Sequence, residues 1–274
     1  MPIQSTLERL FSLKGKTALV TGASGGLGRN MAVALAGAGA RIGIHGTKMD
    51  KLEGTRQAVE EAGGNGVVIP ALLGDADQCQ KLAIDAQSAL GRIDILVNCA
   101  GTSRRKLIDS VTQEDFDWII GVNLRSAFFL SQAVHPMMRH QGGGKIINIG
   151  SMTSILGFAN LSVYGMTKSA LAQVTKTMAV EWAGDNIQVN CVAPGFIHTP
   201  LTEAYYWKNP HRSRWLFDRI PARRAGLPED LEGIMVWLAS PASSYVTGQI
   251  IAVDGGFTAG GSWEQASTEQ QPDG

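Results

Sequence analysis

Residues 16–44 constrain the fold of this chain more than any other segment. A short apolar run at 16–20 leads into T-G-A-S-G-G-L-G at 21–28, and a helical pattern at 29–38 and a second apolar run at 40–44 follow. Glycines in such a turn let the backbone approach a pyrophosphate, which the amino end of the next helix stabilises through free N–H groups and its dipole. Because a strand precedes the turn and a helix follows it, we predict dinucleotide binding rather than a merely structural turn. The expected contacts are Gly22, Ser24, Gly26, Leu27 and Gly28.

The rest of the chain continues this alternation of strands and helices. Apolar runs that predict strands lie at 67–73, 93–97, 145–149, 187–192 and 248–256, and helical patterns lie at 49–61, 78–90 and 230–239. Strands joined by helical crossovers form a parallel sheet with right-handed connections, and ligands bind beyond the carboxyl ends of its strands. We therefore predict an α/β chain with a Rossmann-type, doubly wound parallel sheet.

The end of the second predicted strand indicates which dinucleotide binds. Residues 45–48 read His-Gly-Thr-Lys, where an NAD site usually carries an acid for the ribose 2′-hydroxyl. Without that acid, a 2′-phosphate could be held by Thr47, Lys48 and local backbone amides such as that of Gly46. We predict that NADP is preferred and that NAD is possible. The alternative is that Thr47 and Lys48 only begin the next helix.

Length and composition limit the domain organisation and the class of partner. The 274 residues fit one large domain, which we place at 1–262, and residues 263–274 have too few apolar side chains to bury and are expected to be a disordered tail. Lysine plus arginine equals aspartate plus glutamate at 24 each, and no basic run occurs, so a nucleic-acid partner is not expected. A small molecule is the expected partner.

No targeting, membrane or metal signal is evident. The amino terminus lacks a basic region followed by a long apolar run, and no stretch of about 18 apolar residues occurs, so we expect a soluble cytoplasmic protein with no membrane contact. The three cysteines are far apart and the five histidines form no ligand motif. Buried thiols and no metal are expected.

Tyr164 and Lys168 form the candidate proton-transfer pair. They stand four residues apart where a helical pattern begins, so both side chains should lie on one face of a helix. A free tyrosine has a pKa of about 10, but an adjacent ammonium favours its phenolate and suits it to move protons nearer neutrality. An isolated pair of this spacing arises readily by chance, so other motifs must decide.

Several motifs in one order resemble the short-chain dehydrogenase/reductase family over about residues 12–257. They are the glycine turn, N-C-A-G at 98–101, and Ser151 with the Tyr164/Lys168 pair. The resemblance implies a seven-stranded sheet, a nicotinamide cofactor, a catalytic tetrad completed by Asn123, and a homotetramer. It also implies that Tyr164, Lys168 and the following residues contact the cofactor: Leu73, Asn98, Ala100, Gly101, Pro194, Gly195, Ile197 and Thr199.

Two positions depart from the family pattern. Cys99 replaces the second asparagine of the usual N-N-A-G, which we expect to be a harmless packing change. Leu72 stands where the family usually carries an acidic or amide residue against the adenine. This puts the usual adenine hydrogen bond in doubt without removing the site.

Four segments narrow the resemblance within the family: A-G-T-S-R-R-K at 100–106, I-I-N-I-G-S-M at 146–152, I-P-A-R-R-A-G-L-P-E-D at 220–230 and I-A-V-D-G-G-F at 251–257. They are most similar to those of gluconate 5-dehydrogenase and related sugar-acid dehydrogenases. We therefore predict interconversion of a secondary alcohol and a ketone on a polyhydroxy acid, with its carboxylate met by Arg104 or Arg105. Residues 199–222, rich in aromatic and basic side chains, are interpreted as a substrate lid; the alternative is a surface helical pair with Trp207 and Trp215 packed inward. Further candidate substrate contacts are Thr153, Asn160, His198 and Trp207.

The same sequence motifs are compatible with other functions. A 3-oxoacyl thioester reductase or a general reductase of cyclic ketones would use the same catalytic residues. An epimerase or dehydratase usually has a longer carboxyl-terminal substrate region, and a non-catalytic dinucleotide-binding protein is disfavoured because no tetrad position is lost.

Overall fold

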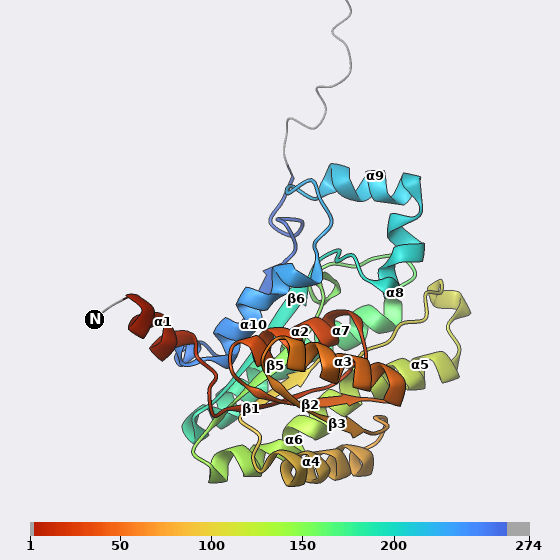
Figure 1. Cartoon of the computed structure of the whole chain (residues 1–274). Helices are drawn as coiled ribbons and strands as arrows, with labels where there is room; N and C mark the ends of the chain where they lie inside the picture. Colours follow the sequence, from red (N-terminus) through yellow and green to blue (C-terminus); the bar gives the residue numbers. More distant parts are fainter. Residues whose placement is uncertain (1–2, 262–274) are drawn as a thin grey trace, which may run out of the picture.

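A seven-stranded parallel sheet forms the centre of the computed structural model, which describes residues 3–261 (Figure 1). The strands are β1 (Thr17–Val20), β2 (Arg41–Gly46), β3 (Asn65–Pro70), β4 (Ile95–Asn98), β5 (Gly144–Ile149), β6 (Ile187–Pro194) and β7 (Ile250–Val253). Their order is β3-β2-β1-β4-β5-β6-β7, and every pairing is parallel. The chain therefore reverses its direction of progress between the adjacent strands β1 and β4, as the doubly wound prediction requires.

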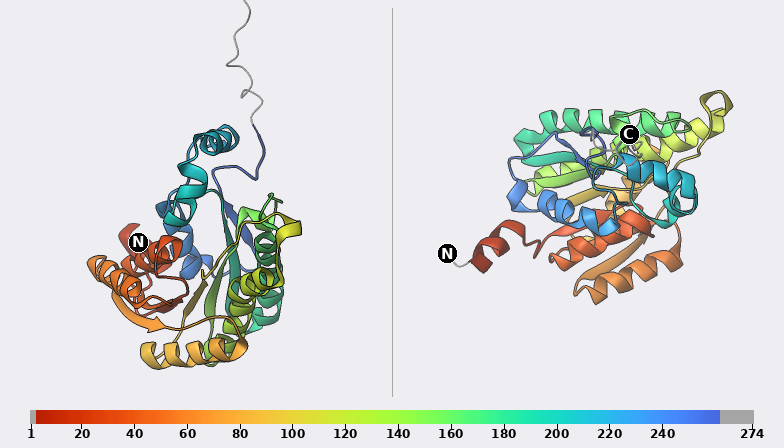
Figure 2. Two further views of the ribbon diagram at one scale, coloured as in Figure 1. Left: turned by 90° about the vertical axis from the view of Figure 1, so that its right-hand side faces the viewer. Right: turned by 90° about the horizontal axis from the view of Figure 1, so that it is seen from above.

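Helices cover both faces of the sheet. The α-helices are α1 (Ile3–Phe11), α2 (Gly26–Gly37), α3 (Met49–Glu61), α4 (Ala76–Leu90), α5 (Gln113–Ile120), α6 (Ser126–His140), α7 (Ser162–Trp182), α8 (Pro200–Thr202), α9 (Pro210–Arg219) and α10 (Glu232–Ala239). One hydrophobic cluster packs α2, α3 and α10 on one face, and another packs α4, α6 and α7 on the other. Figure 2 (left) shows the red and orange helices and the green helices on opposite sides of the strands.

Short helical turns connect these elements. The 3-10 turns are η1 (Ile108–Ser110), η3 (Met152–Ser154), η4 (Ala183–Asp185), η6 (Pro228–Leu231) and η7 (Pro241–Ser243). The π-helical turns are η2 (Gly121–Arg125) and η5 (Glu203–Trp207). The helix predicted at 230–239 thus begins with a 3-10 turn and becomes α-helical at Glu232.

The third strand ends earlier than predicted. It spans Asn65–Pro70, where 67–73 was expected, and its last pairing joins Pro70 to Gly46. Proline has no N–H with which to extend a ladder, so it suits the final position of an edge strand. Leu72 and Leu73 consequently lie in the loop that leads to α4, and Leu72 is 65% exposed.

The segment predicted as a lid folds as α8, η5 and α9 above the carboxyl ends of the strands (Figure 1). It has its own small core, in which Leu216 and Ile220 pack with Met152 and Phe196. Trp207 packs against this core, whereas Trp215 is 39% exposed and lies beneath Arg219, so the alternative with both tryptophans inward is wrong for Trp215.

The predicted tail at 263–274 lies outside the described residues, and the domain limits of 1–262 stay a prediction. No helix within residues 3–261 has the length and apolar character needed to cross a bilayer.

Candidate active site

The carboxyl ends of four strands bring the predicted cofactor segments to one edge of the sheet. The glycine turn follows β1, and residues 46–48 lead from the end of β2 to α3. Residues 98–101 start at the last residue of β4, and residues 194–199 start at the last residue of β6. Parallel pairing places these ends on the same side of the molecule. A ligand bound there would contact segments that are far apart in the sequence.

The glycine turn is shaped by close backbone approaches. A Cβ added at Gly22 would lie 2.8 Å from the Cα of Ala100, and one at Gly28 would lie 2.8 Å from the carbonyl carbon of Gly22. Gly22 also has a φ of 69°, which favours glycine. By contrast, a Cβ at Gly25 or Gly26 would meet nothing within 4 Å.

The amino end of α2 next to this turn is open to an anion. Gly25 is the residue before the helix, and within residues 3–261 no side-chain cap accepts a hydrogen bond from the first N–H groups. A twelve-residue helix leaves these donors and its positive dipole end for a ligand. The open space at Gly25 and Gly26 and the uncapped amino end fit a dinucleotide pyrophosphate.

Thr21 ties the glycine turn to the N-C-A-G segment, a role that the sequence analysis did not anticipate. Its hydroxyl accepts hydrogen bonds from the backbone N–H groups of Cys99 and Ala100, both at 3.0 Å, and donates to the carbonyl of Val97 at 3.2 Å. Thr21 is 2% exposed. The glycine turn after β1 and the N-C-A-G segment after β4 are thereby fixed to each other.

The end of β2 presents an exposed threonine and lysine. Thr47 and Lys48 are exposed, and Lys48 precedes the first turn of the thirteen-residue helix α3 without a side-chain cap. Gly46 is buried against Leu52. Burial lowers the pKa of the neighbouring His45 to about 4, so that imidazole is neutral near pH 7 and Lys48 is the cation at this strand end.

Ser151 is held in place by the turn that follows β5. It caps η3, where its oxygen accepts a hydrogen bond from the N–H of Thr153 at 3.1 Å. Two bonds join η3 to α7: Ser154 Oγ donates to the carbonyl of Lys168 at 2.8 Å, and Ser169 Oγ donates to that of Thr153 at 3.2 Å. Ser151 is therefore fixed relative to the helix that carries Tyr164.

Tyr164 and Lys168 lie one turn apart near the start of α7, as predicted from their spacing. The Nζ atom of Lys168 is 5.7 Å from the centroid of the Tyr164 ring and donates to the carbonyl of Ile149 at 2.6 Å. Lys168 is only 3% exposed and forms no ion pair with a carboxylate of residues 3–261. Because little water screens it, its positive charge acts strongly on nearby groups.

Asn123 lies in the π-helical turn η2, between α5 and α6. Its side-chain oxygen accepts from the N–H of Thr102 at 2.7 Å, and its amide nitrogen donates to the carbonyl of Thr102 at 2.9 Å and to Thr167 Oγ1 at 3.2 Å. A π-turn of this kind is frequent at functional sites. Asn123 thus links the loop after β4 to α7.

The side chain of Asn98 faces the interior, not a cofactor. It is 4% exposed, and its amide nitrogen donates to Ser131 Oγ at 2.9 Å and to Asn148 Oδ1 at 2.8 Å. Asn148 in turn donates to Thr175 Oγ1 at 2.9 Å. This buried chain of hydrogen bonds connects β4 and β5 to α7, the helix of Tyr164 and Lys168, so any contact of Asn98 with the cofactor must come from its backbone.

The segment after β6 is also tightly placed. A Cβ at Gly195 would lie 2.7 Å from the Cα of Asp254, so only glycine fits beneath the loop that follows β7. Ile197 is 5% exposed and its side chain packs toward Gly226. Thr199 caps α8 through a hydrogen bond from the N–H of Thr202. The backbone of Pro194–Thr199, and not these side chains, is the surface available to a cofactor.

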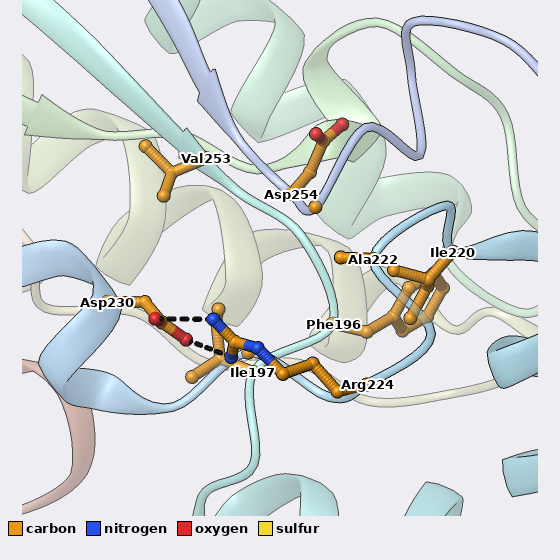
Figure 3. A pocket seen from close by; sticks show the side chains of 10 residues that line it. Phe196, Ile197, Ile220, Ala222, Arg224, Asp230, Val253 and Asp254 are labelled. Atoms are coloured by element: carbon orange, nitrogen blue, oxygen red, sulfur yellow. Dashed lines mark hydrogen bonds and ion pairs between the residues drawn. The ribbon is translucent and has the colours of Figure 1, made fainter.

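A cavity of about 180 Å³ is lined by Phe196, Ile197 and residues of the loops that follow α9 and β7. In Figure 3, Arg224 reaches across Ile197 to Asp230, and two dashed lines mark their paired hydrogen bonds at 2.6 and 2.8 Å. The guanidinium lowers the pKa of Asp230 to about 2. None of Ser151, Tyr164 and Lys168 lines this cavity, so it is separate from the candidate proton-transfer residues.

The two candidate arginines have different surroundings. Arg104 donates to Asp115 at 2.9 Å and to Glu114 at 3.0 Å, and it stacks on Trp118. Hydrogen bonds from Lys106 and Arg104 hold the pKa of Asp115 well below its usual range. Because its charge is already matched by two carboxylates of its own chain, Arg104 is a poor substrate ligand.

Arg105 points to the lid instead. Its guanidinium lies 4.1 Å from the ring of Tyr205, and Nη1 donates to the hydroxyl of Tyr206 at 2.9 Å. It forms no ion pair within residues 3–261. The sequence did not separate Arg104 from Arg105, and their contacts do.

The other candidate substrate residues lie in four segments: η3, the loop before α7, the segment after β6, and η5. Asn160 has a left-handed φ of 66° in the loop before α7, and Thr153 is buried with no hydrogen-bond partner for its hydroxyl among the described residues. His198 pairs with Glu203, and the indole N–H of Trp207 donates to Thr202 at 3.1 Å. One ring nitrogen of His198 and the indole N–H of Trp207 are therefore bonded to neighbouring side chains of this segment.

The described residues contain no group of three or more His, Cys, Asp or Glu side chains arranged to hold a metal ion.

A protein-family model described as enoyl-(acyl carrier protein) reductase matches residues 22–258, which is most of the chain. The chain belongs to the short-chain dehydrogenase/reductase family. A 2-dehydro-3-deoxy-D-gluconate 5-dehydrogenase of Escherichia coli (strain K12) is 44% identical over 250 residues, which cover 91% of this chain and 98% of that protein. A tropinone reductase homologue of Arabidopsis thaliana is 40% identical over 258 residues, or 93% and 96% of the two chains.

A solved structure of a short-chain dehydrogenase/reductase shares the fold closely. The gluconate 5-dehydrogenase of Burkholderia cenocepacia J2315, in complex with NADP and tartrate, has a TM-score of 0.89 and 37% identity, and covers 93% of this chain and 99% of its own. The family membership and the seven-stranded fold predicted from the motifs are thus confirmed.

Proposed function

We propose that this protein is an NADP-preferring oxidoreductase that interconverts a secondary alcohol and a ketone on a polyhydroxy acid, such as gluconate and 5-ketogluconate. The observation that carries the proposal is the juxtaposition of Ser151, Tyr164 and Lys168 at the sheet edge that also holds the glycine turn. The catalytic tetrad consists of these three residues and Asn123. The similarity to sugar-acid dehydrogenases supports the substrate class.

The cofactor preference rests on the end of β2. Thr47 and Lys48 are exposed beside the amino end of α3, and no acid stands at 45–48. A 2′-phosphate there would meet a hydroxyl, a cation and free backbone N–H groups. The solved gluconate 5-dehydrogenase binds NADP, which supports the same preference here.

In the proposed mechanism, the nicotinamide cofactor supplies hydride chemistry and the protein supplies the proton and the orientation. Tyr164 donates its phenolic proton to the carbonyl oxygen in reduction and accepts it back in oxidation. Ser151 hydrogen-bonds the same oxygen, and its own oxygen is oriented by the Thr153 N–H. The buried charge of Lys168 favours the phenolate of Tyr164, and Asn123 holds the loop that ends at Thr102.

The carboxylate of the substrate is assigned to Arg105. This guanidinium lies in the loop after β4, contacts Tyr205 and Tyr206 of the predicted lid, and forms no ion pair within the part of the chain that is described. A substrate carboxylate would supply the missing counter-charge through a charge-assisted hydrogen bond.

A second candidate is the reduction of a bulky cyclic ketone. The aromatic lid favours it, because Phe196, Tyr206 and Trp207 form one packed cluster. The identity with a tropinone reductase homologue is also 40%. A 3-oxoacyl thioester reductase remains a lesser alternative.

A side-by-side assay tests these candidates. Nicotinamide absorbance is followed with gluconate, 5-ketogluconate, a 3-oxoacyl thioester and tropinone as the cyclic ketone. We expect 5-ketogluconate to give the highest kcat/KM, Arg105→Ala to raise its KM, and Arg104→Ala to leave that KM nearly unchanged. If tropinone wins and neither arginine alters KM, the sugar-acid assignment fails.

We also infer a cytoplasmic homotetramer. Large apolar side chains are exposed on α5, α6 and α7, namely Phe116, Trp118, Phe128, Met166 and Val180. Exposed apolar side chains gathered on adjacent helices are typical of a subunit contact. Light scattering after size exclusion should give four times the 29.1 kDa chain mass.

A further inference from the structure

Tyr206 in the lid contacts Arg105 through its hydroxyl and packs on the β6–α8 segment through its ring. Its oxygen accepts a hydrogen bond from Arg105 Nη1 at 2.9 Å, and its ring meets that of Phe196 edge-on at 5.2 Å. Arg105 also stacks on the same ring, with its Cζ 4.8 Å from the centroid. Tyr206 therefore links the loop after β4 to the lid.

The charge balance of that loop leaves one cation without a counter-ion. Arg104 and Lys106 flank Arg105, and both bind the carboxylate of Asp115. Arg105 is bonded only to Tyr206 and stacked on two rings among the described residues. A partly buried guanidinium with no carboxylate attracts an anion strongly, because water does not fully solvate it.

The hydroxyl of Tyr206 is a free donor in the same place. Burial raises the pKa of this phenol, and the charge of Arg105 only partly offsets the effect, so the phenol is protonated near pH 7. Its oxygen accepts from Arg105, while its own hydrogen reaches no acceptor within residues 3–261. The bond from the cation polarises the O–H group and makes it a stronger donor.

The pair lies next to the catalytic tyrosine. The charge of a Tyr164 phenolate would raise the pKa of the Tyr206 phenol. A backbone bridge also joins Lys106, the neighbour of Arg105, to Leu161, three residues before Tyr164. An anion held by Arg105 and Tyr206 would thus belong to a substrate whose carbonyl reaches Tyr164.

We propose that Tyr206 is a specificity-determining residue, which forms with Arg105 a two-donor receptor for the carboxylate of the substrate. The inference rests on the proposed function and deepens it. In this proposal the predicted lid recognises the carboxylate of the substrate, whereas its aromatic composition alone suggested an apolar ketone. A guanidinium N–H and a phenol O–H are matched to the two oxygens of one carboxylate.

Tyr205 and Arg212 hold the receptor in place. The ring of Tyr205 contacts two guanidinium groups, with its centroid 4.1 Å from Cζ of Arg105 and 3.9 Å from Cζ of Arg212. Arg212 also donates to the carbonyl of Tyr205 at 3.0 Å. Helix α9 therefore positions η5, and with it Tyr206, over the loop after β4.

The test compares an acid with a neutral substrate. Tyr206→Phe keeps the ring and removes only the hydroxyl, and the matched control is Tyr245→Phe at a fully exposed tyrosine (101%). With NADPH, Tyr206→Phe should raise KM for 5-ketogluconate about tenfold, the worth of one hydrogen bond to a charged group. For fructose, a ketose without a carboxylate, KM should stay within about twofold, and Tyr245→Phe should alter neither.

Arg105→Gln and the double variant separate the possible failures. If Arg105→Gln leaves KM for 5-ketogluconate unchanged, the carboxylate assignment of the proposed function fails. If Arg105→Gln raises it and Tyr206→Phe does not, the proposed function stands and the role of Tyr206 is overturned. Equal losses on acid and ketose would mean a merely structural tyrosine, and additive effects in the double variant would contradict a shared receptor.

Discussion

Gly28→Ala should destroy the dinucleotide site by opening the glycine turn. A Cβ at this position would lie 2.8 Å from the carbonyl carbon of Gly22 and closer still to its oxygen. Ordinary contacts between carbon atoms begin near about 3.5 Å, so the turn must move by roughly 1 Å. A misplacement of that size can lower a reaction rate by about a hundredfold, and we take the same factor for a pyrophosphate whose backbone donors are displaced. We expect the Kd for NADPH to rise by about that factor.

Gly37→Ala, at the other end of the same helix, is the matched control. A Cβ there meets nothing within 4 Å, so alanine should bind NADPH like the wild type and stabilise the fold by about 0.4–1 kcal/mol. Calorimetric titration with NADPH and thermal unfolding measure both effects. If Gly28→Ala bound NADPH within about threefold of the wild type, the turn could not be the pyrophosphate cradle.

Three further predictions concern the cofactor, the catalytic helix and the stability. Thr47→Asp should reverse the NADPH over NADH preference in kcat/KM by repelling the 2′-phosphate, and an unchanged ratio would contradict this site. Thr175→Val should leave the Asn148 amide unpaired and lower turnover about tenfold. The control is Thr17→Val at the first residue of β1, the end of the strand far from the site, which should lower only the Tm. Burial lowers the pKa of Lys145 from 10.5 to about 8, so the unfolded chain binds more protons between these values and stability rises with pH there. Lys145→Met should remove most of this rise in the free energy of unfolding with pH, as measured by chemical denaturation. Near pH 7 it should stabilise the protein by about 1 kcal/mol, because solvent partly screens the lysine and reduces the cost of its charge.

The sequence predicted the elements that depend on local signals. The helix at Met49–Glu61 has the predicted bounds. Its helical pattern lies between two apolar runs that were predicted as strands, and turn residues separate it from both. The order of the motifs led to the doubly wound sheet, and the spacing of Tyr164 and Lys168 placed both on one helix. Each of these inferences needs only contacts within a few residues or a general rule of chain topology.

Contacts between distant segments could not be predicted in the same way. Arg104 and Arg105 are adjacent and chemically identical in the sequence, and only the positions of Asp115 and Tyr206 distinguish them. Asn98 was expected at the cofactor, but its side chain joins Asn148 on the neighbouring strand. Such pairings depend on which face each side chain occupies after the sheet has formed.

The interpretation of residues 199–222 as a lid rests on composition alone. Its two arginine stacks on Tyr205 need α9 to fold back over η5, and no local signal specifies that packing. The early end of β3 is different, because Pro70 was visible in the sequence and its missing N–H could have marked the boundary.

Turnover of Tyr164→Phe with 5-ketogluconate and NADPH tests the central claim most directly. The phenyl ring fills the same space but carries no transferable proton, and general acid catalysis contributes about a hundredfold or more. We expect kcat below about a hundredth of the wild-type value, with the Kd for NADPH within about threefold. A variant that kept more than about a hundredth of wild-type kcat would contradict the role of Tyr164 as the proton donor.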